Sequence, residues 1–315
     1  MSIAAADAPQ STPRRQSPSK KSSKKSSFTF LFNREAGTCL GRTGKSWLQI
    51  IMFYLTFYTC LGALWIACVA IFVQTLSDKV PKYYGKGSLI GTNPGMGYQP
   101  WLKKDPESTL VRFNVKDPKS YEKYTNALEE YLFKYKDANY TRRCTGNESN
   151  TDDTEQACRF DLDQFREKGC SAEQSFGYAN GTPCVIVTLN RLIGWTPVAY
   201  PKGMEPEEVK GRYRAGDVAI RCNGAYEPDV EHIGIIENIP EMGIPGKFYP
   251  YKVMKNYHQP FAMVKFNSLK LNTLVMVACK AYASNILQDD ADRLGLVRFE
   301  LLIESKSPDE AKKGA

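Results

Sequence analysis

The chain has 315 residues, of which 42% are hydrophobic and 24% charged, and its formal net charge is +8 at pH 7. Residues 1–46 alone contain nine Lys or Arg and two Asp or Glu, a net of +7, so the rest of the chain is close to neutral. With so little net charge, the folded part has no overall basic character to support nucleic-acid binding, and no nucleic-acid partner is predicted.

The first 46 residues form a basic tail. About the first 30 are rich in Ser and Lys and include the run Ser17-Pro-Ser-Lys-Lys-Ser-Ser-Lys-Lys-Ser-Ser27. Low-complexity sequence of this kind is typical of disordered segments, and its lysines are attracted to anionic membrane lipids.

The stretch Gly41-Arg-Thr-Gly-Lys-Ser-Trp47 resembles the end of a phosphate-binding loop. That motif requires a glycine five residues before Gly44, where this chain has Cys39, and an amphipathic helix after the loop. A long apolar run follows instead, so the sequence predicts no nucleotide site here.

Residues 46–77 contain no charged side chain, and residues 47–76 are the apolar part of this run. A helix of that length extends about 45 Å, against a hydrocarbon core of about 30 Å. No other segment approaches about 18 uncharged apolar residues. The run is also too long and too far from the amino terminus for a cleavable signal peptide. Residues 47–76 are therefore predicted to be a single transmembrane helix.

The basic tail predicts a cytoplasmic amino terminus, and hence a single-pass type II protein. Two features beyond the span agree with this orientation. Sequons for N-glycosylation occur only there, at Asn139, Asn147 and Asn180. Six of the nine cysteines also lie there, an even number that is typical of an oxidising compartment. These six are Cys144, Cys158, Cys170, Cys184, Cys222 and Cys279.

The exterior part is expected to begin with an extended stalk over residues 77–116, followed by a folded ectodomain over 117–315. Asp117-Pro118 predicts the start of a helix. Apolar and tyrosine side chains then recur at steps of three and four residues, which predicts a packing face. They are Tyr121, Tyr124, Leu128, Tyr131, Leu132 and Tyr135.

Residues 141–183 are polar and contain the first three ectodomain cysteines, so short disulfide loops are expected to hold this segment. The sequential pairing scheme is the simplest, but six cysteines allow 15 pairings and the sequence leaves them open.

Strand-like patterns follow, and together they favour an antiparallel sandwich. The predicted strands are 185–189, 217–222, 232–237, 261–266, 273–281 and 296–304. A bridge between Cys222 and Cys279 would join two sheets, as in immunoglobulin-like domains, although the usual Trp and Tyr hallmarks are absent.

The sequence contains few groups for catalysis. Both histidines, His232 and His258, have no partner at metal-ligand spacing and are interpreted as structural. Two Asp-x-Asp patterns, Asp161-Leu-Asp163 and Asp290-Ala-Asp292, leave a glycosyltransferase as the enzyme alternative. No acid–base constellation supports it.

The predicted span carries two distinct faces. Tyr54, Phe57, Tyr58 and Leu61 form an aromatic face, and Thr59, Ala63, Ala67 and Ala70 form a face of small residues. Tyrosine hydroxyls within a bilayer need hydrogen-bond partners that lipid tails do not offer, and small residues let helices approach closely. These faces favour docking onto a membrane partner with several spans.

Several stretches resemble the beta subunits of the Na+/K+-ATPase family, which includes the H+/K+-ATPase beta subunit. They are Phe32-Asn-Arg-Glu35, Leu40-Gly-Arg-Thr-Gly-Lys-Ser-Trp47, Phe53-Tyr-x-x-Phe-Tyr58, Pro183-Cys-Val-Ile-Val-x-Leu-Asn-Arg-Leu-Ile-Gly-Trp195, Phe248-Tyr-Pro-Tyr251, Gln259-Pro260 and Cys279-Lys-Ala-Tyr-Ala-Ser-Asn-Ile286. The family's glycine face in the span is replaced here by Thr59, Ala63 and Ala67.

The resemblance implies a non-catalytic subunit of the plasma membrane. Such a subunit assists folding, assembly and delivery of a catalytic alpha subunit and modulates its K+ affinity. It needs no cofactor beyond N-linked glycans, because Na+, K+, Mg2+ and ATP bind the alpha subunit. A small single-span regulatory subunit is a further expected partner.

The resemblance also implies specific residues. Tyr54, Phe57 and Tyr58 would face the seventh transmembrane helix of the alpha subunit. The segment Phe248, Tyr249, Pro250 and Tyr251 would cover the loop between its seventh and eighth helices. The implied fold is an immunoglobulin-like sandwich interrupted by helix, with disulfides Cys144–Cys158, Cys170–Cys184 and Cys222–Cys279. The alternative functions are a beta subunit of an H+/K+-ATPase and a glycosylated cell-adhesion protein.

Overall fold

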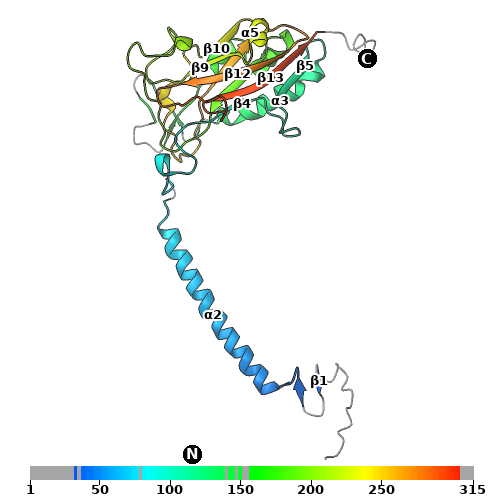
Figure 1. Ribbon diagram of the computed structural model, residues 1–315, viewed down its shortest axis with the longest axis vertical. Coiled ribbons are helices and arrows are strands. Elements are labelled where there is room, and N and C mark those ends of the chain that lie inside the picture. The colour runs from blue at the N-terminus through cyan, green and yellow to red at the C-terminus, as the bar shows by residue number, and fades with distance from the viewer. Residues whose placement is uncertain are drawn as a thin grey trace, which may run out of the picture. The chain divides into compact units, whose positions relative to one another are not determined.

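The computed structural model describes residues 32–33, 37–77, 80–137, 139, 141–145, 148–150 and 156–305 (Figure 1). Contacts divide the chain into an amino-terminal unit, Met1–Thr75, and a carboxy-terminal unit, Leu76–Ala315. The predictions for the first ~30 residues and for the sequon at Asn147 lie outside the described residues.

A short hairpin leads into the long helix of the first unit. Strands β2 (Thr38–Cys39) and β3 (Arg42–Thr43) are antiparallel, and β1 (Phe32–Asn33) pairs with β2. Leu40 and Gly41 connect them with φ angles of 50° and 75°, and positive φ at both positions suits a two-residue hairpin turn. The residues ahead of Gly44 therefore form a hairpin and not the glycine-rich loop of a phosphate site.

Helix α2 (Gly44–Gln74) has 31 residues and begins and ends slightly earlier than the predicted span 47–76. The indole N–H of Trp47 donates to the carbonyl oxygen of Cys39 at 2.9 Å and so fastens the hairpin to the first helical turn. In the described part of the chain, α2 is the one helix long and apolar enough to cross a membrane.

The carboxy-terminal unit contains two four-stranded sheets. The first sheet is antiparallel throughout, in the order β10 (Ile236–Ile239), β11 (Phe261–Phe266), β8 (Cys184–Leu189) and β4 (Met96–Gln99). The second sheet has the order β5 (Leu110–Asn114), β13 (Leu296–Glu304), β12 (Leu274–Tyr282) and β9 (Ala219–Gly224). Its β5–β13 pair is parallel and its other pairs are antiparallel.

The two sheets share one hydrophobic core. Tyr98 of the first sheet stacks on Phe299 of the second at 4.9 Å between ring centroids, and Phe266 meets Phe299 edge-on at 6.2 Å. Phe299, Leu301 and Ile303 of β13 are buried and Glu300 and Leu302 between them are partly exposed, as the alternation of side chains along a strand requires. The unit is thus mainly β, and its assignment to the immunoglobulin-like class stays a prediction.

Helix α3 (Pro118–Phe133) begins where the sequence predicts, because the Asp117 side chain accepts a hydrogen bond from the backbone N–H of Lys119 at 3.1 Å. The predicted face packs inward, with Tyr124, Leu128 and Leu132 buried. The ring of Tyr124 stacks on the buried Tyr178 at 6.1 Å, which joins α3 to the core.

Shorter elements complete the unit. They are η1 (Gly85–Gly87), η2 (Lys134–Lys136), β6 (Thr141–Arg142), β7 (Ala157–Cys158), α4 (Asp163–Glu167), η3 (Ala172–Asn180), η4 (Glu207–Val209), α5 (Glu227–Ile233) and η5 (Gly246–Phe248).

Three disulfides join Cys144 to Cys158, Cys170 to Cys184 and Cys222 to Cys279, the pairs that the resemblance implies. The prediction that the last bridge joins two sheets is wrong. Cys222 in β9 and Cys279 in β12 are directly opposed on neighbouring strands of one sheet. Their Cα atoms are 4.0 Å apart, so the bridge reinforces a strand pair and leaves the contact between sheets to side-chain packing.

Two other predictions need correction. The stalk expected over residues 77–116 contains strands β4 and β5, one in each sheet, so its second half belongs to the folded core. The strand predicted at 232–237 begins only at Ile236, because His232 lies in α5. Pro228 favours the start of that helix, and Gly234, with φ of 67°, ends it.

We expect Asp117→Ala to lower the free energy of unfolding by about 1 kcal/mol, because the variant leaves the first turn of α3 uncapped. Thermal unfolding of the purified protein measures this, with Asp117→Asn as the matched control that keeps a capping oxygen. Equal losses of stability in both variants would contradict a capping role.

Candidate functional site

Two of the four aspartates that suggested an enzyme, one from each Asp-x-Asp pattern, have side-chain partners within the chain. Asp290 pairs with Lys280 at 3.2 Å and with Arg298 at 3.0 Å, and the hydrogen bond from Lys280 holds the pKa of Asp290 below its usual range. Asp161 accepts a hydrogen bond from the backbone N–H of Asp163 at the start of α4. Over the described ranges, no group of three or more His, Cys, Asp or Glu could hold a metal ion.

Each histidine also has a local role. His258 is buried, and its Nε2 atom lies 2.9 Å from the carbonyl oxygen of Asp137. Burial lowers the pKa of His258, which favours the neutral ring. The Nε2 atom of His232 lies 3.0 Å from Nζ of Lys270. These contacts agree with the structural interpretation of both residues.

The aromatic face of α2 is a continuous row of rings. Tyr54 and Tyr58 stack at 6.1 Å between centroids, and Phe53 and Phe57 stack at 6.3 Å. Tyr54 is 50% exposed, Phe57 48% and Tyr58 62%. Helical periodicity predicts Tyr54, Phe57 and Tyr58 on one face and does not include Phe53, although its ring meets that of Tyr54 edge-on at 5.5 Å.

The polar groups of α2 differ in how they are satisfied. The hydroxyl of Thr59 donates to the carbonyl oxygen of Leu55 at 2.7 Å, and Thr56 donates to Met52 at 2.9 Å. Within the described part of the chain, the hydroxyls of Tyr54 and Tyr58 make no hydrogen bond. In an apolar surrounding they would need a partner from outside the chain.

The Phe248–Tyr251 segment is largely part of the core of the carboxy-terminal unit. Phe248 meets Phe160 edge-on at 5.1 Å, and Tyr249 meets Trp195 at 5.2 Å. Phe248 is 4% exposed and Tyr249 7%, so these two rings are occupied within the chain. The partly exposed Tyr251 is the member of this segment whose ring remains available at the surface.

Buried polar contacts position this segment. The Asn150 side chain donates to the carbonyl oxygen of Phe248 at 2.7 Å and accepts from the backbone N–H of Cys158 at 2.7 Å. The buried Asp217 accepts from the backbone N–H of Gly246 at 2.8 Å. The Cys144–Cys158 loop and the segment just before β9 therefore both hold the turn at η5.

A cluster of cations and aromatic rings adjoins Tyr251. The Arg191 guanidinium lies 5.4 Å from the ring of Tyr251 and 5.6 Å from that of Tyr257, within cation–π range. Lys134 lies 4.0 Å from the ring of Tyr131. Partial burial, and secondarily the charge of Arg191, lowers the pKa of Lys134 to about 8.

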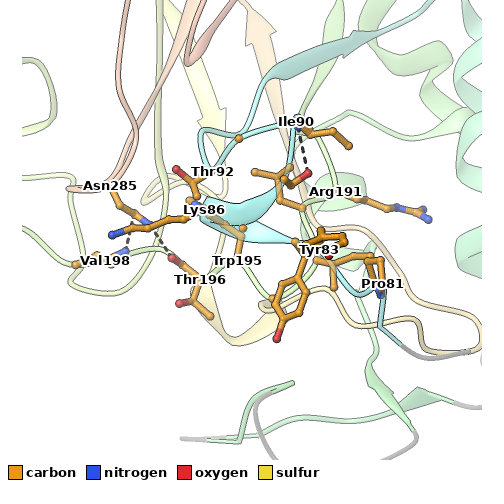
Figure 2. A pocket seen from close by; sticks show the side chains of 17 residues that line it. Pro81, Tyr83, Lys86, Ile90, Thr92, Arg191, Trp195, Thr196, Val198 and Asn285 are labelled. Carbon is orange, nitrogen blue, oxygen red and sulfur yellow. Dashed lines mark hydrogen bonds between the residues drawn. The ribbon is translucent and has the colours of Figure 1, made fainter. Parts of the chain in front are cut away.

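A cavity of about 450 Å³ lies in the carboxy-terminal unit (Figure 2). Residues 81–92 form one part of its wall, and residues 191–196 with Val198 and Asn285 form the rest. The Asn285 side chain accepts from the backbone N–H of Val198 and donates to the carbonyl oxygen of Thr196, both at 2.9 Å. These bonds fix the wall that contains Trp195.

Arg191, Trp195 and Asn285 lie within stretches that resemble the family, but no role was predicted for them. One available signal is compositional. Residues 80–104 and 190–204 contain no Asp or Glu, although about one residue in nine of the chain is acidic. The predicted glycosylation sites at Asn139 and Asn180 are exposed, and their modification stays a prediction.

Comparisons with known proteins agree over most of the chain. The family described as sodium / potassium ATPase beta chain matches residues 17–299. A probable sodium/potassium-transporting ATPase subunit beta-3 from Caenorhabditis briggsae is 51% identical, over 89% of this chain and 87% of its own length. A subunit beta-1 from Tetronarce californica is 35% identical, over 88% and 95%. A human subunit beta-2 is 30% identical, over 87% and 92%.

Gly246→Ala is expected to destabilise the protein by roughly 2 kcal/mol or more, because a Cβ atom at this position would lie 1.9 Å from the carbonyl oxygen of Gly216. Thermal unfolding measures the loss. Gly87→Ala is the matched control, since its Cβ would meet open space. Identical melting curves for the two variants would refute the close approach.

The acylation rate of Lys134 should rise with pH with a midpoint near 8, because only the neutral amine reacts and its pKa is lowered to about 8. Arg191→Gln removes a nearby positive charge, so the midpoint should move to higher pH, whereas Arg212→Gln should leave it unchanged. Mass spectrometry of the modified peptide gives both midpoints. A Lys134 midpoint near the ordinary lysine value of about 10.4 would contradict the effect of burial.

Proposed function

The chain belongs to the sodium/potassium ATPase beta-chain family, and from this membership we propose that it assembles with the catalytic alpha subunit of a Na+/K+-transporting P-type ATPase as its non-catalytic subunit. The observation that carries the proposal is the family match over residues 17–299, which includes both α2 and nearly all of the carboxy-terminal unit. With one apolar helix of sufficient length among its described residues, the chain is a single-pass membrane protein.

The proposed orientation places the amino terminus in the cytoplasm and the carboxy-terminal unit outside the cell, at the plasma membrane. The net charge of +7 on residues 1–46 supports this through the preference of basic segments for the cytoplasmic side. The three disulfides support it too, since all of them lie after α2 and bridges of this kind persist in oxidising compartments.

Within the membrane, the row Phe53, Tyr54, Phe57 and Tyr58 is the proposed contact with a transmembrane helix of the alpha subunit. Its rings are exposed, and the hydroxyls of Tyr54 and Tyr58 can bond a partner's backbone or side chains. The small-residue face at Thr59, Ala63 and Ala67 could admit a further helix, such as a small regulatory subunit.

Outside the membrane, Tyr251 and the backbone of the Phe248–Tyr251 segment are the proposed contact. Phe248 and Tyr249 serve it indirectly, because their buried rings fix the turn that presents Tyr251. The ring of Tyr251 is further oriented by Tyr257, at 4.8 Å between centroids.

Assistance in folding and control of K+ affinity follow from such contacts. When α2 packs against the alpha subunit in the bilayer, it supplies van der Waals contacts and hydrogen-bond partners to groups that would otherwise face lipid. These contacts stabilise the assembled form. If the part of the alpha subunit that α2 contacts differs between the ion-binding states of the pump, the contact shifts the equilibrium between those states. A few-fold change in K+ affinity needs a difference of about 1 kcal/mol in contact free energy.

Replacing Tyr54, Phe57 and Tyr58 together by Leu is expected to leave expression intact and to change the apparent K+ affinity of the assembled pump a few-fold, because the hydroxyl contacts are lost. Transport assays over a range of K+ concentrations measure the effect.

The control variant is Met52→Leu with Ile66→Leu, on another side of the helix by its 100° step per residue. Unchanged K+ affinity in the assembled triple variant would contradict the modulating role.

Assembly itself is tested separately. The detergent-solubilised chain should co-purify with a multi-span ATPase, and recovery of the chain without one would overturn the proposed function.

A further inference from the structure

A short segment after α2 exposes an unusual amount of apolar surface. Leu89 is fully exposed, Ile90 is 79% exposed and Tyr83 is 70% exposed. Together with Tyr84, Lys82 and Lys86 these side chains form what we call the stalk surface. None of its apolar side chains belongs to the core of the carboxy-terminal unit.

The charge on and beside this surface is of one sign. Lys82, Lys86 and Arg191 form no ion pair within the described ranges. The two neighbouring stretches, residues 80–104 and 190–204, contain no carboxylate at all. Among the described residues this surface therefore has no counterion, and it is complementary to an anionic group.

The cavity beside the segment shares this chemistry. Tyr83, Ile90 and Arg191 lie along one side of it (Figure 2). Lys86 and Arg191 are the charged residues among those that line it, and its other walls are mostly apolar. An apolar recess bordered by cations suits an amphiphile whose polar head is negatively charged.

Covalent connectivity limits how far this segment can be from the membrane. Tyr83 follows Gln74, the last residue of α2, by nine residues, and an extended chain covers at most about 3.5 Å per residue. Tyr83 therefore lies within about 30 Å of the end of the helix.

We propose that the stalk surface rests on the phospholipid headgroups of the membrane that α2 crosses, with Leu89 and Ile90 among the headgroups and the three cations beside the lipid phosphates. Tyrosine, aliphatic side chains and lysine together are the composition of membrane-interface anchors. The centres of protein interfaces are instead depleted of Lys, which favours lipid over a protein partner. The inference rests on α2 spanning the bilayer and not on binding to the alpha subunit.

The test is the depth of a fluorophore in the full-length chain. Leu89→Cys is labelled in a background carrying Cys39→Ser, Cys60→Ser and Cys68→Ser, which removes the free thiols. The chain is reconstituted, alone and with its catalytic partner, in vesicles of phosphatidylcholine containing some phosphatidylserine. Quenching by headgroup nitroxide lipid is compared with quenching by aqueous iodide. Leu271→Cys is the matched control, an exposed leucine between β11 and β12.

The label at position 89 should be quenched by lipid several-fold more than the label at 271 and should be shielded from iodide. Replacing Lys82 and Lys86 by Gln should lower the equilibrium constant for contact between the stalk surface and the anionic headgroups roughly fivefold for each lysine removed. Equal lipid quenching at both positions would overturn the proposal. So would a label at 89 that is shielded from both quenchers in the complex, since a protein would then cover this surface. Co-purification with the ATPase is independent of either result.

Discussion

None of the 31 residues of helix α2 is buried against the described part of the chain, and the architecture of the protein follows from this. Its backbone bonds are made internally, so its apolar side chains are what need a non-aqueous surrounding. Thr56 and Thr59 donate to the preceding turn, whereas the hydroxyls of Tyr54 and Tyr58 make no hydrogen bond to the residues that the structure describes. A helix needed only as an anchor would not require those two groups. The carboxy-terminal unit, by contrast, is a complete domain with its own core.

Where local sequence signals and tertiary packing agree, the fold could be predicted. The Asp117-Pro118 start of α3 and the strands at 185–189, 261–266 and 296–304 are of this kind. Strand β4 could not be seen in advance, because it has four residues and lies among Gly and Pro. Strand β5 lies in a segment that was assigned to the stalk, and its place in the second sheet depends on pairing with the distant β13. Likewise, the direct opposition of Cys222 and Cys279 depends on a register that spacing alone does not reveal.

The candidate site divides in the same way. The aromatic row of α2 follows from helical periodicity, so the sequence indicated it apart from Phe53. The Phe248–Tyr251 segment was identified as a motif, but a motif does not distinguish rings that face a partner from rings that face the core. Burial distinguishes the two kinds of ring here. Phe248 and Tyr249 are buried and hold the turn, whereas Tyr251 is partly exposed at the surface. The buried side chain of Asn150 bonds both Phe248 and Cys158. Because the sequence around Asn150 is polar, its pattern does not predict that this side chain is buried.

The parallel pairing of β5 with β13 has a mechanical consequence. β5 is the first strand of the second sheet along the chain, after β4 of the first sheet, and β13 is the last described strand before the carboxyl terminus. Two backbone hydrogen bonds of 3.0 Å join the ends of this pair: Glu300 N–H donates to Thr109, and Val115 N–H donates to Glu304. Arg112 and Glu304 add an ion pair of 2.7 Å. Tension applied between the anchor and the carboxyl terminus pulls parallel neighbours in opposite directions, so it loads these bonds in shear and all at once. An antiparallel pair loaded in this way would instead open one bond at a time. Along that line of force the second sheet therefore resists stretching.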